Sequence, residues 1–293
     1  MSIGPLLEGL CDDAALFPPG NAPLPVAVPA HAVHKTSAHA ALVGAFVFPA
    51  GRLDELAEFL SDQEYPGTLA VSLTAPAGTG SVKPALEKAA AIAPVSVIAL
   101  EIAVPAEQTV DELFTALGEI ASAEPGIEIF VEVPRDDRRP EILARLAGTG
   151  YKAKFRTGGI VAEAYPSEAE LAAAISTVVS TGVPFKATAG LHHAIRNTAP
   201  KTGFEQHGFV NLLAATAAAV AGADTVTVAG VLAERDSAVL VAQLSELADD
   251  RAGEVRRHFL SYGTCSIAEP LADLVDLGLV PATLSPITEG SVS

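Results

Sequence analysis

Short runs of β-branched and aromatic residues alternate with longer Ala-, Leu- and Glu-rich segments along most of the chain. The runs expected as strands are residues 41–48, 68–75, 95–103, 127–133, 151–157, 183–189, 224–230 and 258–263. Between them, apolar residues recur at helical spacing, which predicts helices such as 52–62, 109–123, 167–180 and 209–222. Ser167, followed three positions later by Glu170, has capping-box spacing at the start of one of these helices.

Repeated strand–helix units are typical of a parallel sheet connected by helices. Eight such units in 293 residues, near the roughly 250 typical of the fold, predict an α/β protein, a (β/α)8 TIM barrel. The alternative is an open doubly wound sheet, which usually carries G-x-G-x-x-G after its first strand, and residues 45–55 do not match it. We therefore expect one barrel domain over residues 41–282, with an N-terminal extension over 1–40 and a poorly ordered tail over 283–293.

Charge and hydropathy restrict the partners. With 18 Lys and Arg against 35 Asp and Glu, the formal charge of −17 disfavours nucleic acid and anionic membrane surfaces. The first residues lack signal-peptide features, and no apolar run reaches the roughly 18 residues of a membrane span. We expect a cytoplasmic protein with no nucleic-acid or membrane partner, and the composition is compatible with a homo-oligomer.

Ionisable residues fall on barrel-facing positions of four consecutive expected strands. In residues 151–157 and 183–189, alternation directs Phe155 and Phe185 toward the helices and leaves the cations inside. The expected interior set near the C-terminal strand ends, where barrels keep their chemistry, is Glu101, Glu132, Lys154, Arg156, Lys186 and Thr188. Buried charges require partners, so the two glutamates and the three cations are expected to form a compensating set; a purely structural ion-pair network is the alternative.

Lys186 is the candidate with distinctive chemistry. Desolvation and the nearby cations Lys154 and Arg156 should lower its pKa toward neutrality. A neutral amine can attack a carbonyl and form a Schiff base, which serves as an electron sink for carbon–carbon cleavage or condensation.

The stretch FKATAG, residues 185–190, resembles the sixth-strand motif K-x-[ST]-x-G of the deoxyribose-phosphate aldolase group of class I aldolases. The resemblance implies that Lys186, on the sixth expected strand, forms the Schiff base. That family also has a second lysine in its seventh strand. The seventh expected strand, residues 224–230, has none, and the extra cations lie on the fifth as Lys154 and Arg156.

The segment after Gly190 is long for a strand–helix connection, as is typical of a lid or binding loop. His192 and His193 stand at its start, where either can move protons near neutral pH. Arg196 can close over an anion. Backbone N–H groups of Gly158 and Gly159, expected to enter a helix, can hold phosphate or carboxylate.

Together these features favour an aldolase-like lyase that acts on a small anionic carbonyl compound without a cofactor or metal. Lys186 is the expected amine, Lys154 and Arg156 tune it and bind the anion, and Glu132 or His192 moves protons. One alternative is a metal-dependent hydrolase or isomerase using Glu101, Glu132, His192 and His193 as ligands. Another is a non-catalytic barrel that binds a phosphate-bearing metabolite.

Three other features are interpreted structurally. Adjacent Asp12 and Asp13 could reach a metal or the barrel mouth, but are expected to be helix caps. The histidines within residues 31–39 lack the neighbouring carboxylate of a zinc motif. Cys265 is expected to be a buried structural thiol rather than a nucleophile.

Overall fold

A closed barrel of eight parallel strands forms the centre of the molecule. The computed structural model describes residues 4–63 and 65–284, so most of the expected tail at 283–293 lies outside the described residues. The barrel strands are β1 (Cys11–Asp13), β2 (Val43–Pro49), β3 (Leu69–Ala75), β4 (Val95–Ala103), β5 (Glu128–Glu132), β6 (Lys152–Arg156), β7 (Phe185–Thr188) and β10 (Phe259–Thr264). They follow one another in chain order, and β10 closes the ring against β1. The (β/α)8 prediction is confirmed.

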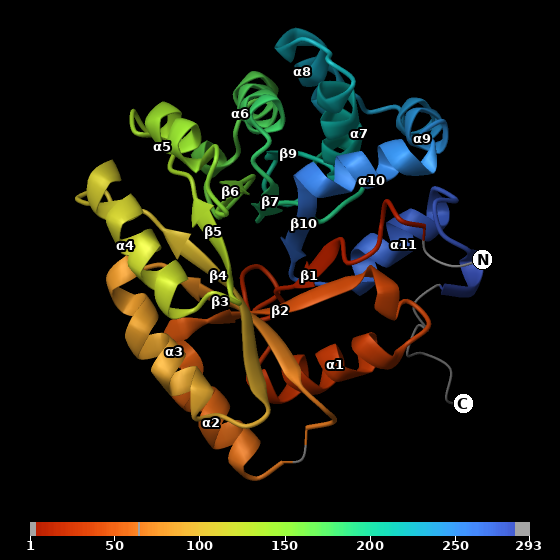
Figure 1. The fold of residues 1–293 in the computed structure, drawn as a ribbon. Coiled ribbons are helices and arrows are strands. Elements are labelled where there is room, and N and C mark those ends of the chain that lie inside the picture. Colours follow the sequence, from red (N-terminus) through yellow and green to blue (C-terminus); the bar gives the residue numbers. More distant parts are fainter. Residues whose placement is uncertain (1–3, 64, 285–293) are drawn as a thin grey trace, which may run out of the picture.

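The helices lie around the outside of these strands (Figure 1). They are α1 (Leu24–Thr36), α2 (Leu53–Ser61), α3 (Val82–Ala90), α4 (Val110–Ala123), α5 (Arg139–Leu146), α6 (Glu168–Thr181), α7 (Phe209–Val220), α8 (Thr225–Ala233), α9 (Ser237–Ser245), α10 (Asp249–His258) and α11 (Ala268–Asp276). A short antiparallel hairpin, β8 (Asn197–Thr198) and β9 (Glu205–Gln206), lies in the segment between β7 and α7.

One expected strand is wrong. Residues 224–230 form most of helix α8, because Asp224 caps it by accepting the amide hydrogen of Thr227 and the helix packs against its neighbours α6 and α7. The missing barrel strand is β1, within the segment expected to be an extension. Counted from β1, Lys154 therefore lies on the sixth strand and Lys186 on the seventh.

The start of helix α6, near the site, is stabilised by a side-chain cap and by ion pairs. At α6, Ser167 accepts the amide hydrogen of Glu170, as the capping-box spacing predicts. The Glu170 carboxylate does not complete the box, because it pairs with Arg135 and Arg139 of the preceding unit. These contacts tie the β5–α5 and β6–α6 units together at the end of the barrel where the strands finish.

The main core lies between the strands and the helices. Phe155 and Phe185 are buried there, with ring centroids 5.5 Å apart, and Phe259 of β10 stacks on Phe185 at 5.0 Å. The expected alternation of strands β6 and β7 is therefore confirmed, because their apolar residues pack outward. Their alternate residues are left to face the barrel interior.

Candidate active site

The Lys186 ammonium lies inside the barrel between two carboxylates. Its Nζ donates to Asp12 Oδ2 of β1 and to Glu101 Oε1 of β4, each at 2.6 Å. Lys186 and Glu101 are each only 2% exposed. Two hydroxyls complete the group, since Ser72 donates to Glu101 and Ser261 donates to Asp12. The lysine thus links β7 to two non-neighbouring strands, β1 and β4, across the barrel interior.

The Lys154 ammonium occupies the same register one strand away and shares one of these carboxylates. Its Nζ lies 2.8 Å from Glu101 Oε2 and 2.8 Å from Glu132 Oε2. The other Glu132 oxygen accepts from Arg156, whose side chain is 46% exposed. Because Lys154 and Lys186 are paired in the β6–β7 register, Glu101 bridges the two ammonium groups.

The six charges of this group balance. Three carboxylates face three cations in a chain of contacts from Arg156 through Glu132, Lys154, Glu101 and Lys186 to Asp12. A buried ion pair is tolerated only with close geometry and additional hydrogen bonds, both of which are present here. The compensating set expected from the sequence is confirmed, with Asp12 as an added member.

The expected lowering of the Lys186 pKa is wrong. Burial alone would lower the pKa, but Asp12 and Glu101 outweigh it and raise the Lys186 pKa above its usual value. Burial also opposes the charge of Lys154, whose pKa is raised in turn by Glu101 and Glu132. Burial raises the pKa of Glu101, but the two lysines reverse this and hold it well below its usual range. Both amines are ammonium ions in the resting protein.

A cavity of about 1170 Å³ opens where the strands end. Its lining includes Glu101, Glu132, Lys154, Arg156, Thr188, Gly159, His192 and His193. Lys186, Gly158 and Arg196 are not among the lining residues. Lys154 is therefore the lysine of the pair that a molecule in the cavity can reach, whereas Lys186 does not line the cavity.

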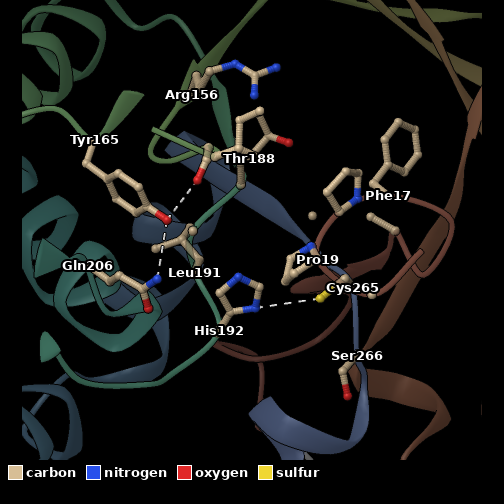
Figure 2. A pocket seen from close by; sticks show the side chains of 18 of the residues that line it. Phe17, Pro19, Arg156, Tyr165, Thr188, Leu191, His192, Gln206, Cys265 and Ser266 are labelled. Atoms are coloured by element: carbon tan, nitrogen blue, oxygen red, sulfur yellow. Dashed lines mark hydrogen bonds between the residues drawn. The ribbon is translucent and has the colours of Figure 1, made fainter. Parts of the chain in front are cut away.

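Three residues of the segment after β7 have different roles. His192 lies on the cavity wall with Nδ1 3.6 Å from the Cys265 thiol, and burial lowers the His192 pKa. Figure 2 shows this contact. His193 is half exposed and pairs with Asp273 at 3.3 Å. Arg196 is not brought to the cavity, because its side chain is 9% exposed and bound to Glu168 and Glu205.

The paired glycines after β6 serve close packing. A Cβ on Gly158 would lie 2.7 Å from the Gly190 Cα and 2.8 Å from the Tyr165 ring. The expected helix entry is absent here, since residues 158–159 lead into a loop and a 3₁₀ turn at Ala162–Ala164. The glycine requirement is thus explained by the contact between the β6 and β7 ends. A role in binding phosphate stays a prediction.

Asp12 is the site residue that the sequence interpretation missed. It caps no helix; Oδ1 accepts from the Ala45 amide and Oδ2 from Lys186 and Ser261. The neighbouring Asp13 accepts a hydrogen bond from the Ala15 amide, and its other carboxylate oxygen lies 3.0 Å from Nδ1 of buried His31. A three-residue strand with two acids has no hydrophobic alternation to reveal it. The only signal was the position of two acids before a Pro/Gly turn.

The side chains of the site offer no evident metal ligand set. Within residues 4–63 and 65–284, no group of three or more His, Cys, Asp or Glu side chains is arranged to hold a metal ion. Glu101 and Glu132, two of the expected ligands, are bound to Lys154 instead. In the described chain, no helix is long and apolar enough to cross a membrane.

Comparison with protein-family models, with curated proteins and with solved structures finds no match to this chain.

Proposed function

We propose that this barrel is a class I aldolase-like lyase in which Lys154, rather than Lys186, supplies the Schiff-base amine. The observation that carries the proposal is the position of Lys154 on the cavity lining, between Glu101 and Glu132, at the middle of β6. Lys186, in contrast, does not line the cavity; it is buried, and its ammonium compensates the charges of Asp12 and Glu101.

The corrected strand count supports the exchange of roles. The aldolase group that residues 185–190 resemble places its Schiff-base lysine on the sixth strand and a second lysine on the seventh. Lys154 lies on the sixth barrel strand and Lys186 on the seventh. Residues 154–158, KFRTG, also keep the four-residue spacing from lysine to glycine, although arginine replaces the hydroxyl residue at the third position.

Proton transfer must precede attack, because Lys154 is an ammonium ion at rest. Glu132 is the candidate acceptor, since its carboxylate touches Lys154 and its side chain is 19% exposed at the cavity. The neutral amine then attacks the substrate carbonyl carbon, and the carbonyl oxygen leaves as water after gaining two protons. The iminium positive charge replaces that of the ammonium, so Glu101 and Glu132 remain compensated.

Carbon–carbon cleavage follows from the iminium. The bond between the α and β carbons breaks, and its electron pair moves toward the iminium nitrogen to give an enamine. The β-hydroxyl loses its proton to a carboxylate or to His192 and becomes the carbonyl of the released aldehyde. The enamine carbon regains a proton, and water hydrolyses the iminium to release the second product and free lysine.

Trapping tests this proposal. Wild-type protein incubated with pyruvate and borohydride in the presence of EDTA should gain a reduced adduct, and peptide mass spectrometry should place it on Lys154. The trapped fraction should increase with pH above neutrality, because the raised Lys154 pKa keeps the amine protonated. Lys154→Met should abolish the adduct, and Lys88→Met, at an exposed ion pair with Asp54, should retain it. An unchanged adduct in Lys154→Met would contradict the assignment.

A second candidate is favoured by the full pairing of both lysines. Two ammonium ions held by three carboxylates suit a barrel that binds an anionic metabolite at Arg156 without covalent chemistry. In that case pyruvate or inorganic phosphate would bind, measured by calorimetry, while borohydride trapped nothing on any lysine.

A further inference from the structure

The cavity is larger than a small polar substrate requires. Its volume of about 1170 Å³ exceeds the roughly 300–1,000 Å³ usual for pockets that hold drug-sized ligands. The ion pairs gather at one place, around Lys154 and Arg156. Much of the remaining wall comes from the loops that follow the strands.

Apolar side chains on opposite sides of the cavity mouth, together called the apolar wall, come from three separate loops. The β1–α1 loop contributes Phe17, Pro18 and Pro19, the β6–α6 loop contributes Ile160, and the β7–α7 segment contributes Leu191 and Phe204. Figure 2 shows Phe17 and Pro19 on the side of the pocket away from Tyr165 and Leu191. Because these side chains come from different barrel units, the apolar wall is a property of the assembled cavity mouth.

The rim carries an exposed aliphatic side chain. Ile160 lines the cavity and is 84% exposed, and its neighbour Val161 is 51% exposed. Phe204 is only partly covered, by the Tyr165 ring at 5.7 Å. A single exposed Ile needs no explanation, but apolar side chains continuous with a cavity mark a ligand surface.

We propose that the substrate is an amphipathic 2-oxo acid with an aliphatic or aromatic substituent, rather than a small sugar phosphate. Its carboxylate pairs with Arg156 and its keto carbon faces Lys154. Its substituent lies between Phe17 on one side of the mouth and Leu191 and Phe204 on the other. The covalent part rests on the proposed function. Binding of the substituent does not, because it depends on the wall alone.

The test measures, by calorimetry, equilibrium binding of three oxo acids to the wild-type protein: pyruvate, 2-oxooctanoate and phenylpyruvate. Glyceraldehyde 3-phosphate is measured in the same way as the sugar-phosphate comparison. Reversible imine formation contributes to the Kd of all three oxo acids, so differences among their Kd values report the contribution of the substituent. From the area that the longer probes bury, Kd should fall by roughly tenfold or more relative to pyruvate. Phe204→Ser and Ile160→Ser should each reduce the difference in Kd between pyruvate and the longer probes. The second variant guards against misfolding, because Ile160 is a surface side chain. Val226→Ser, at an exposed valine of α8, is the matched control.

Two failures are distinguishable. Equal Kd values for the three probes, or tighter binding of glyceraldehyde 3-phosphate than of phenylpyruvate, would overturn the inferred substrate class even if pyruvate is trapped on Lys154. Tight binding of phenylpyruvate that Ile160→Ser weakens, without any borohydride-trapped adduct, would support the apolar wall and overturn the Schiff-base proposal.

Discussion

Lys186 stays charged because two carboxylates reach it from β1 and β4. Removing its ammonium while keeping a side chain of similar length leaves Asp12 and Glu101 buried without part of their compensation. Lys186→Met should therefore lower the free energy of unfolding by about 3–5 kcal/mol. Urea denaturation followed by circular dichroism measures this change.

The matched control is Lys88→Met, because Lys88 is 53% exposed and its partner Asp54 is in solvent. Its unfolding free energy should stay within about 0.5 kcal/mol of the wild type. A loss below about 1 kcal/mol for Lys186→Met would show that the interior carboxylates do not depend on this lysine.

At the residue scale, strand alternation predicted which side chains point inward but not their protonation. Glu101, Glu132, Lys154 and Lys186 all face one another as the alternation of two-residue period requires. The sign of the Lys186 pKa shift was wrong because Asp12, whose strand could not be recognised, and Glu101 together outweigh burial. A pKa is set by partners distant in sequence, and strand alternation alone could not show that both carboxylates contact the Lys186 ammonium.

At the element scale, the segment from β7 to α7 covers the cavity through anchors outside it. Arg196 binds Glu168 of α6 at 2.5 Å and Glu205 of β9 at 3.3 Å, while Lys201 at the hairpin turn is exposed. Arg196→Ala should release the hairpin, so that trypsin cleaves after Lys201 about tenfold faster, which corresponds to about 1.4 kcal/mol of local stability.

Timed proteolysis with mass spectrometry follows that one cleavage. Arg235→Ala is the control, because Arg235 also contacts Glu205 but its side chain is 50% exposed. It should leave the rate nearly unchanged. Equal acceleration in both variants would mean that Glu205 pairing in general, rather than the buried Arg196, holds the hairpin.

Element prediction failed where local pattern and tertiary context disagree. The run DTVTVAG alternates like a strand, yet the Asp224 cap and the packing of α8 against α6 and α7 make it helical. Conversely, β1 has three residues, two of them acidic, and is a strand because the barrel needs an eighth member between β10 and β2. The long strands with clear apolar runs were all correctly expected.

At the scale of the whole molecule, the formal charge of −17 contrasts with the balanced interior. Acid therefore has two opposing effects on stability. It reduces repulsion among surface carboxylates, and it protonates the carboxylates that hold the interior cations. Comparing the wild type with a variant that lacks one interior carboxylate isolates the effect of protonating that carboxylate, because surface repulsion is nearly the same in the two proteins.

Glu132→Gln makes this comparison. Burial would raise the Glu132 pKa, but Lys154 and Arg156 reverse this and hold it below its usual value of 4.5. A carboxyl whose folded pKa is depressed contributes stability above its unfolded pKa, and the contribution is lost as pH falls through the folded pKa. At pH 7 the variant should be less stable than wild type by about 2 kcal/mol. The difference in unfolding free energy between variant and wild type should narrow progressively below about pH 4.5 in urea titrations.

The control is Glu119→Gln, on the exposed face of α4, which should differ little from wild type in unfolding free energy at either pH. A constant difference from pH 7 to pH 3 would show that Glu132 stabilises the barrel by packing and not by its charge.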